Sequence, residues 1–162
     1  MNVKRIIYFL IIVITCLACK SQQPLSANNN KLCKVEYSNY GGIHGWEESL
    51  SITEENISYN SISRRTNKSE KELEKTSENV WRKLESSLDI HLLERIKSGE
   101  STLLYDGKDT KFKIVLCSGK EFSFINSQDS DEYQKMNEFF STILDCRTKI
   151  ISKINNNDKI NH

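Results

Sequence analysis

Short segments in which apolar and polar residues alternate constrain this chain more than any other feature. Three of them predict strands with one buried face; their apolar positions are Cys33, Val35 and Tyr37, then Leu50 and Ile52, then Ile57 and Tyr59. Pairing Ile52 with Ile57 makes residues 53–56 a four-residue loop in which Asn56 suits a left-handed backbone. The second and third segments therefore predict an antiparallel hairpin.

Three other segments have apolar residues at helical spacing. The first opens with a capping box formed by Ser69 and Glu72, which predicts a helix start. Its apolar stripe consists of Leu73, Val80, Trp81, Leu84 and Leu88. A short second helix is expected from Ile90 to Ile96, and a last helix from about Asp131. The apolar stripe of the last helix consists of Tyr133, Met136, Phe139, Phe140, Ile143, Cys146, Ile150 and Ile154.

The register of a second hairpin follows from which side chains must be buried together. A two-residue turn at residues 118–119 places Phe122 and Phe124 on the face opposite to Phe112 and Ile114. A three-residue loop at residues 117–119, with Gly119 in a left-handed bulge position, instead pairs Ile114 with Phe122. It also pairs Phe112 with Phe124, so burial favours the three-residue loop.

The order of these elements favours a single α+β domain. Three strands, two helices, two strands and one helix fit one antiparallel sheet of about five strands, covered by helices on one face. One proline, six glycines and 37% hydrophobic residues argue against a collagen-like, disordered or polytopic membrane protein. We expect the domain at residues 32–154, between a flexible tether at residues 19–31 and a disordered tail at residues 155–162.

Residues 1–18 have the layout of a signal peptide. Lys4 and Arg5 precede an uncharged apolar run that continues to Cys19, and polar residues follow. A membrane-spanning helix needs about 20 apolar residues, so this run predicts an export signal rather than a permanent anchor.

The end of the run resembles the lipobox of bacterial lipoproteins, in which a small residue precedes a lipidated cysteine. Ala18-Cys19 matches this pattern, although Cys16 stands where the family usually has leucine; Cys16 itself, after Thr15, is the alternative. The resemblance implies a lipid anchor on Cys19 that includes a fatty acyl chain such as palmitate, and each buried methylene contributes about 0.8 kcal/mol to anchoring. Lys20 is not the aspartate that retains such lipoproteins in the inner membrane, so the resemblance implies the outer membrane.

Three cysteines remain after Cys19, in a compartment that permits disulfides. Cys117 lies in the second hairpin loop, and a final helix of about 22 Å returns Cys146 to that end of a strand about 20 Å long. We therefore expect a Cys117–Cys146 disulfide, with Cys33 as the alternative partner. The spacing of cysteines and histidines matches no zinc motif, so no metal is expected.

Residues 38–46 are rich in glycine and aromatic residues but match no phosphate-binding motif. We expect Tyr40, Ile43 and Trp46 to cap one end of the sheet; the alternative is that they contact a partner. Asp106 and Asp109 offer too few oxygen ligands for calcium and predict a turn before the next strand.

The lipobox, the glycine-rich segment at residues 41–45, Trp81 and the turn at residues 105–107 together resemble the small uncharacterised lipoproteins of Bacteroidetes. That resemblance supplies no activity, cofactor or catalytic residue. With 23 basic and 22 acidic residues, the chain offers no basic surface for nucleic acid. We expect a lipid-anchored, non-catalytic binding or envelope-maintenance module with an envelope protein as a possible partner.

Two alternatives belong to other functional classes. One is a periplasmic hydrolase that uses His91 or His44 with Asp106 or Asp109. The other is an immunity-type lipoprotein that inhibits an envelope toxin, which an exposed loop at residues 40–46 favours. A deep pocket gathering histidine and aspartate favours the hydrolase, whereas an exposed aromatic loop favours binding.

Overall fold

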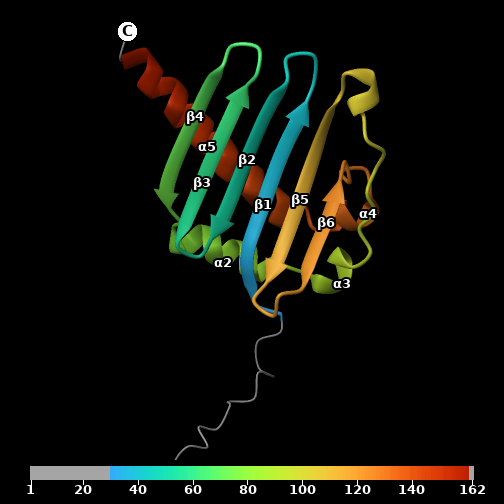
Figure 1. The fold of residues 1–162 in the computed structure, drawn as a ribbon. Coiled ribbons are helices and arrows are strands. Elements are labelled where there is room, and N and C mark those ends of the chain that lie inside the picture. Colours follow the sequence, from blue (N-terminus) through green and yellow to red (C-terminus); the bar gives the residue numbers. More distant parts are fainter. Residues whose placement is uncertain (1–29, 161–162) are drawn as a thin grey trace, which may run out of the picture.

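Strand β1 (Leu32–Gly41) lies inside the sheet and pairs with a neighbouring strand on each side (Figure 1). The computed structural model describes residues 30–160, and side chains up to residue 157. The expected signal peptide, Cys19 and the tether up to residue 29 lie outside the described residues.

All neighbouring strands in the sheet are antiparallel. The other strands are β2 (Trp46–Thr53), β3 (Asn56–Ser63), β4 (Lys68–Lys75), β5 (Lys108–Leu116) and β6 (Glu121–Ile125). Their order across the sheet is β4-β3-β2-β1-β5-β6. The expected α+β fold with one antiparallel sheet is confirmed, but the sheet has six strands instead of about five.

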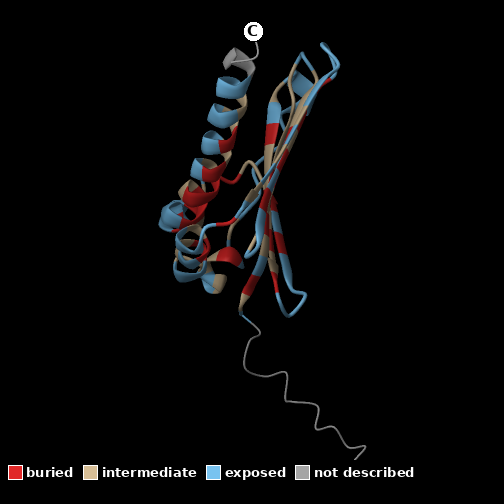
Figure 2. Ribbon diagram, turned by 90° about the vertical axis from the view of Figure 1, so that its left-hand side faces the viewer, coloured by how far each residue is buried: buried red, intermediate tan, exposed pale blue. Residues whose placement is uncertain are grey.

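The helices lie on one face of this sheet, and the other face is open (Figures 1 and 2). They are α2 (Glu78–Ser86), α3 (Ile90–Leu93), α4 (Asp131–Lys135) and α5 (Asn137–Ile160), whereas the short 3-10 helix η2 (Leu103–Tyr105) lies at one end of the sheet, before β5. The last helix predicted from Asp131 is interrupted at Met136. Helix α5 continues past Ile154, so residues 155–160 of the expected disordered tail are helical.

The additional strand is β4, where the capping box predicted a helix. Ser69 and Glu72 lie in β4 and pair with Ile62 and Tyr59 of β3. This pairing supplies hydrogen-bond partners for the edge of β3 that faces away from β2, which a helix at residues 69–75 leaves unpaired. Helix α2 begins later, where the hydroxyl of Ser77 accepts a hydrogen bond from the backbone N–H of Val80.

The predicted hairpin registers are confirmed. Phe112 pairs with Phe124 and Ile114 with Phe122, and Gly119 has a φ of 87° in the loop between β5 and β6. Ile52 pairs with Ile57 as expected. Asn56, in contrast, is not left-handed: it belongs to β3, and its backbone N–H donates to the hydroxyl of Thr53 across a tighter turn.

The core lies between the sheet and α5, where Figure 2 shows the buried residues. Its centre is an aromatic cluster in which the rings of Tyr133 and Phe140 stack at 4.0 Å and Phe112 lies 5.0 Å from Phe140. Helix α5 crosses behind the sheet from the β6 side to the β4 side (Figure 1). At the β4 end of the sheet, α5 contacts the sheet through ion pairs: Lys153 binds Glu72 and Glu74.

The disulfide prediction was wrong in its partner. Cys33 and Cys117 form the bond, with Cα atoms 4.9 Å apart, and Cys146 is a buried free thiol. Cys33 lies at an irregularity in the pairing of β1 with β5, beside the loop that carries Cys117. Helix α5 crosses the sheet toward β3 and β4 instead of returning along β6, so Cys146 does not come back to Cys117. The alternative partner, Cys33, is therefore the correct one.

Candidate functional site

Three connections meet at the end of the sheet opposite to the start of β1 (Figure 1). They are residues 42–45 between β1 and β2, residues 64–67 between β3 and β4, and residues 103–107 before β5, which we call the distal loops. The backbone N–H of Gly42 donates to the carbonyl of Gly107 at 2.8 Å, and that of Arg64 to the carbonyl of Gly45 at 3.3 Å. Backbone hydrogen bonds thus link the three distal loops.

Glycine is required where these loops approach each other most closely. Gly41 has a φ of 108°, and a Cβ atom there lies 2.5 Å from Leu103 Cδ2 and 2.7 Å from the carbonyl oxygen of Gly107. A side chain at position 41 is therefore excluded both by the backbone conformation and by space. The glycines of this segment position the distal loops and do not form a phosphate-binding turn.

The distal loops and adjoining strand ends line a surface groove of about 710 Å3, which we call the rim groove. Its lining residues are Gly41, Gly42, Ile43, His44, Trp46, Ser63, Arg65, Thr66, Asp106 and Lys108. Four of the residues singled out by the sequence analysis, Ile43, His44, Trp46 and Asp106, therefore share one groove. Arg65, Lys108 and Thr66 were missed, because the pairing of distant strands brings them there.

Two cations in the rim groove lack an acidic partner. Arg65 and Lys108 form no ion pair with any residue in the range 30–157, whereas the adjacent Arg64, outside the groove, binds Glu47. Nη1 of Arg65 lies 2.9 Å from Nδ1 of His44. Because guanidinium N–H groups only donate, this contact requires the Nδ1 lone pair of His44 as acceptor.

The expected cap formed by Tyr40, Ile43 and Trp46 is not observed as one unit. Gly41 pairs with Trp46, so Tyr40 and Trp46 occupy opposite faces of the sheet. Both are half-buried, whereas the side chain of Ile43 is 77% exposed. Ile43 therefore does not plug the sheet.

Further apolar side chains are exposed at the same end of the molecule. Leu104 and Tyr105 of η2 are 89% and 85% exposed. With Ile43 they form what we call the apolar tip, because the loops that carry them are joined by the Gly42–Gly107 hydrogen bond. Such protruding apolar side chains are typical of surfaces that contact a partner.

The acidic residues proposed for a hydrolase have different environments. Asp109 is buried, and it accepts hydrogen bonds from Ser101, Thr102 and Asn126. Burial acts to raise the pKa of Asp109, but these hydrogen bonds outweigh it and lower the pKa. Asp109 thus anchors the segment before η2, while Asp106 lies in the rim groove with His44.

His91 lies far from both aspartates in the fold. It belongs to α3, at the end of the sheet where β1 starts, and its side chain is 94% exposed (Figure 1). The structure therefore brings His44 together with Asp106 but does not bring His91 together with Asp106 or Asp109.

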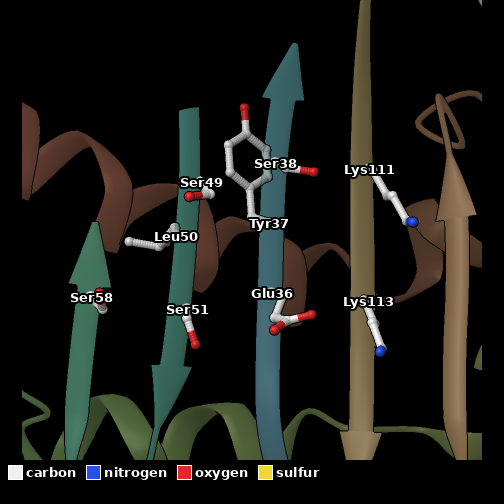
Figure 3. A pocket seen from close by; sticks show the side chains of 9 residues that line it. All are labelled: Glu36, Tyr37, Ser38, Ser49, Leu50, Ser51, Ser58, Lys111 and Lys113. Atoms are coloured by element: carbon white, nitrogen blue, oxygen red, sulfur yellow. The ribbon is translucent and has the colours of Figure 1, made fainter. Parts of the chain in front are cut away.

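The open face of the sheet has a second, smaller depression of about 330 Å3 (Figure 3). Its small hydroxyl side chains, Ser38, Ser49, Ser51 and Ser58, come from three neighbouring strands. Two of its charges are paired, since Glu36 binds Lys34 and Lys113 binds Glu121. Its volume is less than half that of the rim groove, so we regard it as the weaker candidate for a ligand site.

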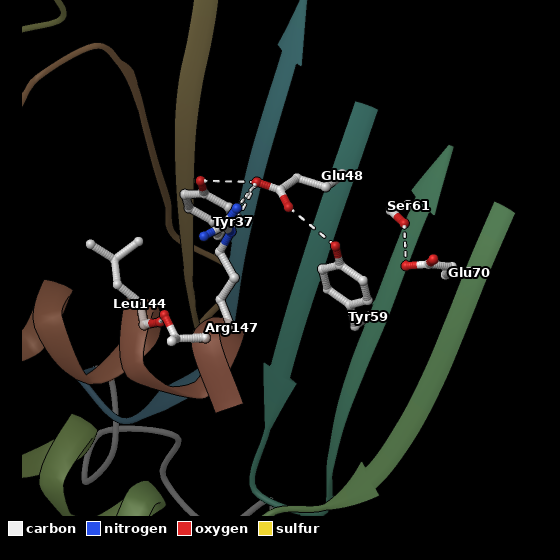
Figure 4. Close-up of polar contacts among 8 residues, drawn as sticks. Tyr37, Glu48, Tyr59, Ser61, Glu70, Leu144 and Arg147 are labelled. Atoms are coloured by element: carbon white, nitrogen blue, oxygen red, sulfur yellow. Dashed lines mark hydrogen bonds and ion pairs between the residues drawn. The ribbon is translucent and has the colours of Figure 1, made fainter. Parts of the chain in front are cut away.

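A buried polar cluster joins α5 to the sheet (Figure 4). Glu48 accepts hydrogen bonds from the hydroxyls of Tyr37 and Tyr59 and binds the guanidinium of Arg147 at 2.9 and 2.7 Å. Burial, followed by smaller effects that include the nearby Glu48, raises the pKa of Tyr59 to about 12. Both carboxylate oxygens of the buried Glu48 are held by other members of the cluster, so we assign the cluster a structural role.

A sequence signal for this cluster exists. Positions 46, 48, 50 and 52 face the helices, and Glu48 is the one charged residue among them. A charged residue at an inward position of an alternating strand indicates a buried partner of opposite charge.

Comparison with known proteins adds no family assignment. No protein-family model matches the sequence, and no curated protein matches it. In the described part of the chain, no group of three histidine, cysteine or acidic residues is arranged to hold a metal ion. No helix within residues 30–160 is long and apolar enough to cross a membrane.

Proposed function

We propose that the chain is a lipid-anchored, non-catalytic binding protein of the bacterial envelope, and that the rim groove is its ligand site. The observation that carries this proposal is the position of the groove. The chain joins the sheet at Leu32, and the rim groove begins at Gly41, at the other end of the ten-residue strand β1. At about 3.3 Å per residue, the two ends lie about 30 Å apart. An anchor that precedes Leu32 leaves the groove facing away from the membrane.

Binding is favoured over hydrolysis by the state of His44. A general base needs a free nitrogen lone pair directed at the nucleophile, and Nδ1 of His44 instead accepts from Arg65. Asp106 occupies a left-handed turn position with a φ of 54° at the exposed end of η2. The groove therefore offers charge and shape for recognition more readily than a nucleophile with its base.

The anchor is part of the same proposal. We infer a signal peptide at residues 1–18, lipidation of Cys19 and residence in the outer membrane, from the lipobox resemblance and from Lys20. Expression of the full precursor with an alkyne-modified palmitate tests the anchor. Cys19→Ala should abolish both labelling and membrane fractionation, while Cys16→Ala should preserve them. Loss of labelling in Cys16→Ala alone contradicts the assignment of Cys19.

Binding at the distal end is tested with the full mature chain in detergent. The wild type should retain purified envelope fragments of the host, and Arg65→Gln combined with Lys108→Gln should reduce that retention. Arg64→Gln is the matched control, since Arg64 is paired with Glu47 outside the groove. Equal retention by all three proteins contradicts the proposed site.

The apolar tip supports the immunity-type alternative, in which the ligand is a protein. Ile43, Leu104 and Tyr105 together present exposed apolar area of the kind found at protein interfaces. Replacing all three by serine should then abolish envelope retention, while the substitutions of Arg65 and Lys108 leave it intact. The two sets of variants therefore separate the alternatives.

A further inference from the structure

We propose that the rim groove binds a sugar ring carrying a carboxylate or a phosphate group. This inference rests on the proposed binding function and specifies the chemistry of its ligand. The groove volume of about 710 Å3 falls within the range of about 300 to 1,000 Å3 that is typical of small-molecule sites.

The anionic part of the ligand follows from the charges of the groove. Arg65 and Lys108 face it without an acidic partner, while Asp106 contributes one negative charge. His44 holds Nη1 of Arg65 and so leaves the other guanidinium nitrogens to donate to an oxyanion. His44 is therefore a positioning residue for Arg65.

The sugar part follows from the neutral groups. Trp46 is half-buried at the end of β2, so its position is fixed while part of its indole remains accessible. The electron-rich face of an indole attracts the polarised C–H groups of a sugar ring. The hydroxyls of Ser63 and Thr66, together with the Asp106 carboxylate, can form hydrogen bonds with sugar hydroxyls.

A simple inorganic anion uses only part of this site. It pairs with Arg65 and Lys108 but leaves Trp46 and the hydroxyls without a contact. The groove also lies at no helix N-terminus, because the connections that line it join strands or precede β5. A ligand with both an anionic group and a ring with hydroxyls engages the whole lining.

The two tryptophans allow a direct test by NMR on the 15N-labelled mature chain in detergent. Trp46 lines the groove, and Trp81 is buried in the core, so the two indole N–H signals report the site and an internal control. Trp46→Phe assigns the signals by removing one of them. The probes are a glucuronate-containing disaccharide, glucose 6-phosphate, the neutral disaccharide maltose and inorganic phosphate.

We expect the first two probes to shift the Trp46 signal in a saturable way and to leave the Trp81 signal unchanged. Arg65→Gln and Lys108→Gln should each weaken binding on the order of ten-fold, because each removes a charged hydrogen-bond donor. Arg64→Gln should change it by less than about two-fold, as expected for an exposed ion pair. Higher ionic strength should also weaken binding.

Three results overturn the proposal: no saturable shift with either acidic sugar, an equal response to maltose, or an equal response to inorganic phosphate. A different result contradicts the proposed binding function. If no distal variant changes envelope retention, the binding site itself is wrong, whereas retention that depends on the groove without any sugar response refutes only the ligand class. Cleavage of the glucuronate disaccharide during the titration contradicts the non-catalytic function and leaves the ligand class standing.

Discussion

Replacing Arg147 by methionine tests whether the buried cluster fastens α5 to the sheet. The change leaves the carboxylate of Glu48, whose side chain is 1% exposed, without its cation. Removing one partner of a fully buried ion pair costs about 3 to 5 kcal/mol. The side chain of Arg147 is itself 28% exposed, and the hydroxyls of Tyr37 and Tyr59 still donate to Glu48. We therefore expect a loss of about 2 to 3 kcal/mol in the free energy of unfolding, below the fully buried value.

For a domain of this size, 1 kcal/mol corresponds to about 3 to 4 °C in Tm, so thermal denaturation followed by circular dichroism should show a decrease of about 6 to 12 °C. Arg82→Met is the matched control, since Arg82 forms an exposed pair with Glu78 on α2 that should contribute less than about 0.5 kcal/mol. Glu48→Gln combined with Arg147→Met should be more stable than Arg147→Met alone, because no unpaired charge remains. If Arg147→Met is as mild as the control, or if the double variant is the less stable of the two, the reasoning is refuted.

Three further results are expected. Cys33→Ser should lower stability by about 4.5 kcal/mol in urea denaturation, the chain-entropy value for a loop of 84 residues, and an equal Tm with and without reductant in the wild type contradicts the bond. Trp81→Ala should cost about 3 to 5 kcal/mol, as a buried aromatic does, and Trp46→Ala clearly less, so equal losses show that Trp46 is part of the core. Burial raises the pKa of Tyr59 and Tyr133 to about 12, so the stabilisation linked to them is complete below pH 10.0 and disappears as the pH rises through about 12. An absorbance titration at alkaline pH in which all tyrosines ionise together near pH 10 contradicts this burial.

The sequence predicted those parts of the fold in which local pattern and burial agree. The hairpin between β5 and β6 is the clearest example, because only one register places Phe112 and Phe124 on the same face. The fourth strand was missed because residues 68–75 contain one apolar residue, Leu73, which is 68% exposed. The hydrogen bonds between β4 and β3 outweigh the local preference of Ser69 and Glu72 for a helix start.

The site was predictable only in part, for a related reason. The sequence indicates Trp46 and His44 as candidate site residues because they belong to one glycine-rich segment. Arg65 and Lys108 come from segments that are distant in sequence and become neighbours through the strand order, which local patterns do not encode. The cysteine pairing failed similarly, since it depended on which strand lies beside β5.

The Cys33–Cys117 bond has a mechanical consequence for the proposed anchor, which would hold the domain through its N-terminal side. A pull on the chain before Leu32 is directed along β1, and a force between that point and the rim groove loads the strand in shear. Because Cys33 is covalently joined to Cys117, the load passes at once into the hairpin of β5 and β6 as well. The hydrogen bonds between β1 and β5 therefore cannot open one after another from the pulled end. Under tension, the first two strands to bear the force behave as a single element, and the groove at their far end keeps its shape.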